Sequence, residues 1–140
     1  MNLRVPIHMP DPAKDFIKAA KRGDLTGLRT LLESNSALIG VRDSDGSTAL
    51  HCATWKGHEE AVAFLLAAGA EIQAHNDNDH WGTTALHAAA HANHVKIAQR
   101  LIDAGADVNA KDREGRTPLF HTTFHKANAT AKVLLKHGAT

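Results

Sequence analysis

Apolar residues at helical spacing recur along the chain, and short polar segments that contain glycine separate them. Leu65 and Leu66 follow Val62 at the three- and four-residue spacing that places side chains on one face of a helix. Leu101–Ile102 and Leu134–Leu135 occupy the same place in later segments. Gly-Ala follows each of these pairs a few residues on, and glycine supplies the left-handed turn that commonly ends a helix. The pattern predicts a series of short helices.

These helical segments belong to a longer repeat of 33 to 36 residues. Thr-Ala-Leu-His begins at Thr48 and again at Thr84, and the related Thr-Pro-Leu-Phe begins at Thr117. A degenerate unit lies upstream, where Asp11 is a suitable N-cap and Pro12 suits the first helical position. We therefore expect a loose leader over residues 1–10 and a single domain over 11–140, with four repeats at approximately 11–42, 43–75, 76–111 and 112–140.

Each unit is predicted to be a pair of helices. Thr48, Thr84 and Thr117 are natural N-caps for a first helix of about two and a half turns, and Gly57 or Asn93 ends it in a left-handed conformation. A second helix follows. Because helices this short are unstable alone, the pairs must stack, and the polar segments between them project as hairpin-like fingers. The predicted fold is an all-α solenoid of about four helix–turn–helix repeats.

The motifs closely resemble the ankyrin repeat family, whose unit opens with Gly-x-Thr-Pro-Leu-His, passes through a Gly-His pair and ends in Gly-Ala-Asp-Val-Asn-Ala. Residues 115–119 and 105–110 match this pattern almost residue for residue, and Gly57-His58 gives the middle pair. The likeness extends over about residues 13–140. Phe120 replaces the expected histidine, and the finger over residues 74–82 carries a three-residue insertion.

The resemblance implies a slightly curved solenoid whose fingers and first helices line a concave groove that binds other proteins. It also implies that His51 and His87 tie the fingers to the helices by hydrogen bonds. In the family's register, Trp55, His91 and Phe124 form one column of the groove, and aromatic residues are frequent anchors of binding energy. The predicted partner-binding residues are Trp55, Lys56, His80, Trp81, His91, Arg113, Arg116, Phe124 and His125. The same register adds Asp45, Ser47, Thr83, Ala92 and Glu114.

The aromatic column has a second interpretation, in which the rings only fill space between the short helices and the fingers. The sequence does not separate groove from core for Trp55 and Phe124. It does indicate that the column continues toward the N-terminus as Lys21 and Arg22. With Lys56, Arg113 and Arg116 nearby, these cations favour an acidic peptide segment as the partner.

Composition restricts the remaining functions. Sixteen basic and fifteen acidic residues give a net charge of +1, without a charge run that would indicate nucleic acid or a membrane surface as partner. No apolar stretch approaches the roughly 20 residues that a membrane span needs. A single cysteine, Cys52, cannot form an internal disulfide, so we expect a cytoplasmic protein.

Eleven histidines suggest a competing hypothesis. The repeat motif accounts for most of them, but His91, His121 and His125 have no structural role in it, and they define an alternative function as a pH- or metal-responsive element. Because two or three histidines without a thiolate are a weak zinc-binding set, we assign no metal site. We expect Cys52 to pack as a small apolar residue. We assign no catalytic or cofactor-binding residue, because no nucleophile beside a base and no paired carboxylates are found.

The sequence thus predicts a non-enzymatic protein-interaction module without cofactors. A structural segment of a longer repeat protein is a further alternative, because no recognisable capping sequence follows residues 138–139. We expect a monomer, with weak association through the uncapped last repeat as the alternative.

Overall fold

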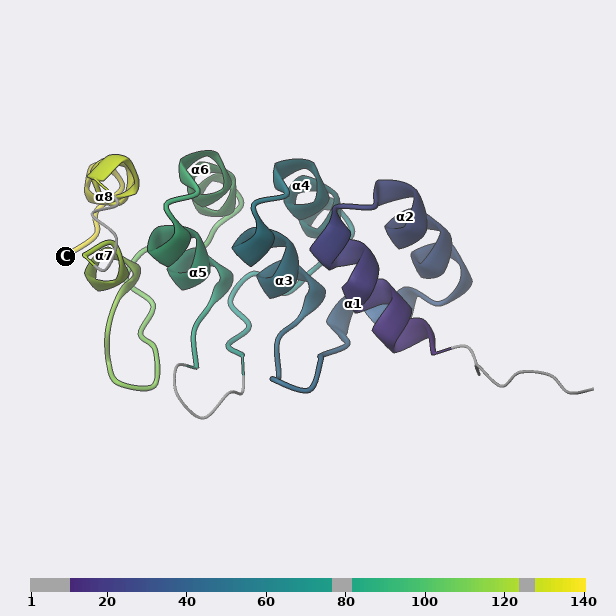
Figure 1. Ribbon diagram of the computed structural model, residues 1–140. Helices are drawn as coiled ribbons and strands as arrows, with labels where there is room; N and C mark the ends of the chain where they lie inside the picture. The colour runs from purple at the N-terminus through teal and green to yellow at the C-terminus, as the bar shows by residue number, and fades with distance from the viewer. Residues whose placement is uncertain (1–10, 77–81, 124–127) are drawn as a thin grey trace, which may run out of the picture.

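The computed structural model describes residues 11–76, 82–123 and 128–140 (Figure 1). The predicted leader over residues 1–10 lies outside these ranges. So do four of the predicted partner-binding residues, His80, Trp81, Phe124 and His125.

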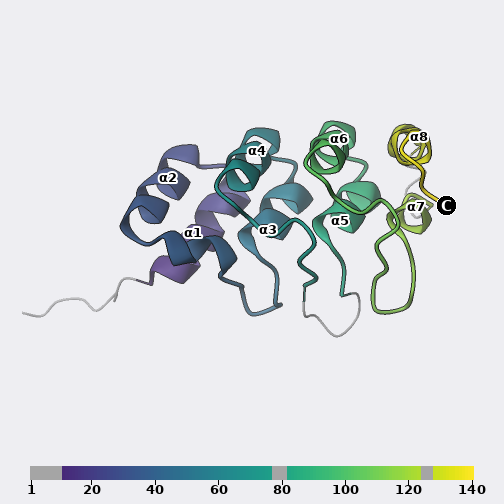
Figure 2. The same cartoon turned by 180° about the vertical axis from the view of Figure 1, so that it is seen from behind.

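The described helices form four consecutive pairs. They are α1 (Pro12–Arg22) with α2 (Leu25–Ser34), α3 (Ala49–Lys56) with α4 (Glu59–Ala67), α5 (Ala85–Ala92) with α6 (Val95–Asp103), and α7 (Pro118–His121) with α8 (Asn128–Lys136). A short 3-10 helix, η1 (Ser36–Gly40), follows α2. The first helices of the pairs form one layer and the second helices another (Figures 1 and 2). Apart from one isolated β-bridge, the described residues contain no strand, so the all-α prediction is confirmed.

The predicted caps explain where these helices begin. Asp11 accepts a hydrogen bond from the Lys14 N–H, and Pro12 occupies the first turn. Thr48 and Thr84 form capping boxes in which the third helical residue is a histidine instead of the usual glutamate or glutamine. The threonine hydroxyl accepts from the histidine N–H, and the histidine ring accepts from the threonine N–H. Local hydrogen bonds between the threonine and the histidine therefore fix where α3 and α5 begin.

The helix ends also follow the prediction at two positions. Gly57 has φ 81° and Asn93 has φ 59°, and both N–H groups bond back to carbonyls of the preceding turn. Glycine and asparagine tolerate this left-handed region better than other residues, which makes these positions natural helix ends.

Helix α7 departs from the prediction, because it spans one turn instead of two and a half. Thr117 lies at the N-cap, but its side chain makes no capping bond, and Phe120 at the third position has no ring nitrogen to complete a box. The hydroxyls of Thr122 and Thr123 donate to the Leu119 and Phe120 carbonyls, at 2.6 and 2.7 Å. Such side-chain bonds compete with helical ones, so the helix stops early.

The core runs through the stack as one continuous apolar cluster. Each pair contributes a fully buried leucine from one or both helices, and alanines such as Ala53 and Ala89 lie where neighbouring first helices meet. Small side chains allow these helices to approach closely, and the leucines fill the space between the two layers. Neither helix of a pair could bury its apolar side without the neighbouring pair, which explains why the units stack.

The polar segments between pairs form the fingers, which project from the layer of first helices (Figure 1). Their described residues are 41–48, 74–76 with 82–84, and 110–117. In each finger one backbone N–H bonds across to a carbonyl on the other arm, at 2.9 Å: Asp43 to Ser47, Asn76 to Thr83, and Asp112 to Arg116. In the finger that carries the insertion, Asn76 thus stands where the other two fingers have Asp43 and Asp112. The backbone bond between the two arms is retained.

Candidate functional site

The concave face carries a hollow of about 450 Å³ between the first helices and the fingers. It extends across residues from all four repeats, since α1, α3, α5 and α7 each contribute at least one side chain. The lining residues are Lys21, Asp43, Asp45, Ser47, His51, Cys52, Trp55, Lys56, Asn76, Thr83, His87, Ala88, His91 and His121. The structure thus places Trp55, Lys56 and His91 of the predicted partner-binding residues in one concave surface.

Trp55 and His91 lie side by side near the ends of α3 and α5, as their equivalent places in the repeat require. Their rings stack with centroids 5.4 Å apart and an angle of 24° between the planes. Trp55 is 50% exposed, so it is a surface residue and not part of the core. Trp55 and His91 both line the hollow, and a partner-binding role for Trp55 stays a prediction. Phe124, the third member of the predicted column, lies outside the described residues.

His51 and His87 connect each first helix to the following finger. The Thr48 and Thr84 N–H groups donate to the Nδ1 atoms, so the Nε2 atoms carry the protons. His51 Nε2 donates to the Thr83 carbonyl at 2.9 Å, and His87 Nε2 donates to the Arg116 carbonyl at 2.8 Å. Burial lowers the pKa of each ring to about 4, which keeps both neutral at pH 7. The structural role implied by the family resemblance is confirmed for both.

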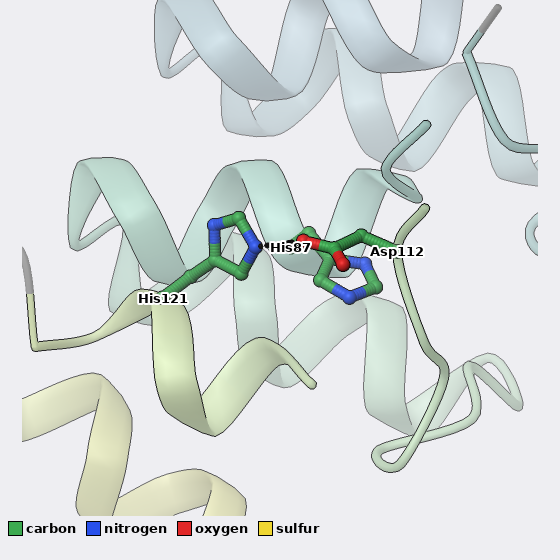
Figure 3. A group of neighbouring side chains, drawn as sticks. All are labelled: His87, Asp112 and His121. Atoms are coloured by element: carbon green, nitrogen blue, oxygen red, sulfur yellow. Dashed lines mark hydrogen bonds and ion pairs between the residues drawn. The ribbon is translucent and has the colours of Figure 1, made fainter. Parts of the chain in front are cut away.

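His121 also has a structural role, contrary to the prediction from the sequence. Its side chain is nearly fully buried, and Nε2 lies 2.8 Å from Asp112 Oδ2 (Figure 3). Arg116 Nε donates to the same oxygen at 3.2 Å, while the Glu114 and Arg116 N–H groups donate to Oδ1. Burial favours the neutral acid, but these hydrogen bonds outweigh it and hold the pKa of Asp112 below its usual value. The carboxylate therefore joins the finger to α7.

Asp112 and its counterpart Asp43 are functional residues that were not predicted from the sequence. Both lie in an Asp-x-x-Gly segment, five residues before the threonine at the start of the next helix. This repeated spacing could have identified them from the sequence. Asp43 Oδ1 likewise accepts from two finger N–H groups, and Cys52, at the place that His121 takes in the last repeat, has Sγ 3.8 Å from Asp43 Oδ2. Burial, and next the Asp43 charge, raise the pKa of the Cys52 thiol to about 12.

The two predicted arginines do not line the hollow. Arg116 is bonded to Asp112 and its guanidinium lies 5.4 Å from the Phe120 ring centroid, with the side chain 26% exposed. Arg113 is exposed on the last finger and packs beside Gly82, where a Cβ would come within 3.2 Å of the Arg113 Cβ. Both therefore belong to the finger surface beside the hollow.

Comparisons with known proteins identify the class. A family model described as ankyrin repeats in many copies matches residues 16–66, and one described as ankyrin repeats in three copies matches residues 72–140. The chain belongs to the ankyrin repeat family. Repeats of this family are generally protein–protein interaction modules and generally non-enzymatic.

Curated relatives share the repeats over part of their length. The chain is 38% identical over 64 residues to human ankyrin repeat domain-containing protein 49, covering 46% of the chain and 27% of that protein. It is 43% identical over 54 residues to human ankyrin repeat domain-containing protein 29, covering 39% and 18%. It is also 40% identical over 62 residues to the probable E3 ubiquitin-protein ligase XBOS32 of Oryza sativa subsp. japonica, covering 44% and 12%. The chain thus matches less than a third of each of these proteins.

None of the described helices combines the length and apolar character that crossing a bilayer requires.

Proposed function

We propose that this protein is a non-enzymatic binding module that holds a segment of another protein in its concave hollow. The observation that carries the proposal is Trp55, half exposed, stacked on His91 and facing a hollow lined by first helices and fingers of several repeats. An exposed tryptophan fixed by a neighbouring ring loses little conformational freedom on binding and offers a large apolar area.

The partner's charge is a finer part of this proposal. Lys21 and Lys56 line the hollow on the helix side, but Asp43 and Asp45 line it on the finger side. Lys21 Nζ lies 3.9 Å from Asp43 Oδ2, so part of its charge is already balanced. Lys56 is then the main cation available to an acidic partner. We place the module in the cytoplasm, because Cys52 is its single cysteine.

A paired capture experiment tests the proposal. The intact chain, Trp55→Ala and Leu135→Ala are immobilised, exposed to lysate of the native cells, and the retained proteins are identified by mass spectrometry. Leu135 is a matched control, because it is an exposed large apolar residue on α8 that does not line the hollow. We expect a protein that the intact chain and Leu135→Ala retain and that Trp55→Ala loses.

Two readouts decide the interpretation. Both variants should keep the helical circular dichroism and the melting temperature of the intact chain, since neither side chain is buried. If Trp55→Ala retains the same proteins as the intact chain, the hollow is not the binding surface. Adding Lys56→Glu to the series tests the charge: weaker retention of the same protein supports an acidic partner, and unchanged retention contradicts it.

A further inference from the structure

Two histidines and one aspartate converge at the junction between the third and fourth repeats. His87 comes from α5, Asp112 from the last finger and His121 from α7. Figure 3 shows the carboxylate facing the His121 ring, and the two histidine rings lie edge to face with centroids 5.0 Å apart. One potential ligand atom from each residue lies within 4.8 Å of the others, and all three residues are buried. We propose that these three side chains form a binding site for a divalent transition metal ion such as Zn²⁺, a function separate from the proposed binding of a protein segment.

The donor set matches the chemistry of zinc. Two imidazole nitrogens and one carboxylate oxygen form the protein ligands of open zinc sites, in which water takes the fourth position. His87 and His121 line the hollow, which gives an ion and its water a path to the site. Bonds of about 2.0 Å in a tetrahedral site put ligand atoms about 3.3 Å apart. Asp112 Oδ2 and His121 Nε2, now 2.8 Å apart, would separate by about half an ångström.

Partners that would orient two of the ligands lie within hydrogen-bond distance. The Glu114 and Arg116 N–H groups hold Asp112 Oδ1, so that Oδ2 is directed toward the histidines. When His87 Nε2 binds a metal, the ring proton moves to Nδ1. Nδ1 then gives up the bond that it accepts from the Thr84 N–H and donates a hydrogen bond to Thr84 Oγ1, 2.8 Å away. Hydrogen bonds of this kind fix the ring orientation and the tautomer of metal-bound histidines.

Metal binding has to displace existing contacts. His87 Nε2 exchanges its bond to the Arg116 carbonyl for the metal, and His121 exchanges its bond to Asp112. The Arg116 guanidinium, bonded to Asp112 Oδ2, repels a cation there and has to move toward solvent, which its partial exposure permits. Arg116 therefore acts as a built-in competitor, and shortening it should strengthen metal binding.

The preceding junction supplies an internal contrast. His51 there corresponds to His87, but Ala88 stands where the last repeat has His121. Among the described residues, the three potential ligands come within reach of one ion at the junction between the third and fourth repeats, through His87, Asp112 and His121.

The experiment titrates the full chain with ZnCl₂ by isothermal titration calorimetry, and with CoCl₂ while the visible absorption of tetrahedral cobalt is followed. We expect one high-affinity equivalent, a rise in melting temperature with added zinc, and cobalt bands in the visible range. Asp112→Asn, which keeps the shape of the side chain, should weaken zinc binding at least tenfold, and Arg116→Ala should strengthen it. His137→Ala removes an exposed histidine on the last repeat and should leave the affinity unchanged.

Imidazole ¹⁵N NMR spectra of the intact chain test whether His87 and His121 bind the metal. This measurement does not depend on whether a substituted chain folds. Zinc should shift the ring signals of His87 and His121. The proposal is overturned if the intact chain binds no zinc equivalent, if Asp112→Asn binds zinc as tightly as the intact chain, or if zinc shifts only the signals of other histidines.

Discussion

At the scale of single residues, burial decides which groups carry charge. His51 is removed from water, and this desolvation is the main cause of its low pKa; Arg42 and His75 nearby lower it further. The hydrogen bond to the Thr83 carbonyl acts in the opposite direction but is outweighed. The neutral ring is the form that both donates to the finger and accepts from Thr48, so charge state and structure are consistent.

The low pKa of His51 predicts acid sensitivity. The unfolded chain takes up a proton near pH 6.5, whereas the folded chain resists it until about pH 4, so protons favour the unfolded state. The stabilisation is complete above pH 6.5 and is lost as the pH falls toward 4, by up to about 3 kcal/mol for this one ring. Urea unfolding at pH 7.5 and pH 5 measures the loss. His51→Asn should show a smaller loss between the two pH values, and an equal loss would assign the effect to other groups.

Cys52 should be chemically inert in the folded state. Its pKa of about 12, against 9.0 for an ordinary thiol, leaves about a thousandfold less thiolate at neutral pH. We expect a disulfide reagent to label the native protein far more slowly than the urea-unfolded protein. Asp43→Asn removes a charge that raises the pKa and should accelerate labelling of the folded chain; rapid labelling of the intact native protein would contradict the assignment.

At the scale of helices, local bonds at the termini set where each element begins. The boxes at α3 and α5 pair a threonine with a histidine three residues on, and the histidine then reaches the next finger. One residue thus serves the start of its own helix and the contact between repeats. In α7 the place of the histidine is taken by Phe120, the box is missing and the helix is shorter.

Replacing the capping threonines by valine tests this difference. Thr84→Val removes the hydroxyl that accepts from the His87 N–H and should lower the free energy of unfolding by about 1–2 kcal/mol. Thr117→Val is the matched control, because Thr117 makes no capping bond, and its effect should stay within about 0.5 kcal/mol. Both values come from urea unfolding. Equal losses would show that the hydroxyl bond at Thr84 does not stabilise the helix start.

At the scale of the whole molecule, each pair contacts its neighbours and the core is continuous along the stack. Contacts between second helices include an exposed ion pair, with Arg100 Nε 2.7 Å from Glu59 Oε2. Such an exposed pair contributes little, so the stacking of leucines and alanines carries most of the stability. In a stack of this kind, stability is a sum over units and their interfaces.

Two leucine substitutions should therefore reduce amide protection over different parts of the stack. Leu86 and Leu134 are both fully buried, so changing either to alanine should lower the free energy of unfolding of its own helix pair by about 2–5 kcal/mol. Leu86→Ala in a central pair should reduce amide protection throughout the stack. Leu134→Ala in α8 should expose the last pair first and leave α1–α4 protected. Hydrogen exchange followed by mass spectrometry distinguishes these patterns, and uniform loss of protection in both variants would contradict independent units.

The helix pairs, their stacking and their caps at Thr48 and Thr84 could be predicted from the sequence, because these features depend on residue types at fixed spacing within one unit. The surroundings of individual side chains could not be predicted in this way. Trp55 is exposed against His91, and His121 is buried against Asp112, although both positions lie on the same layer of helices. The physical reason is that spacing fixes the face of a helix on which a side chain lies, whereas burial and hydrogen bonding depend on what the next repeat and its finger place there.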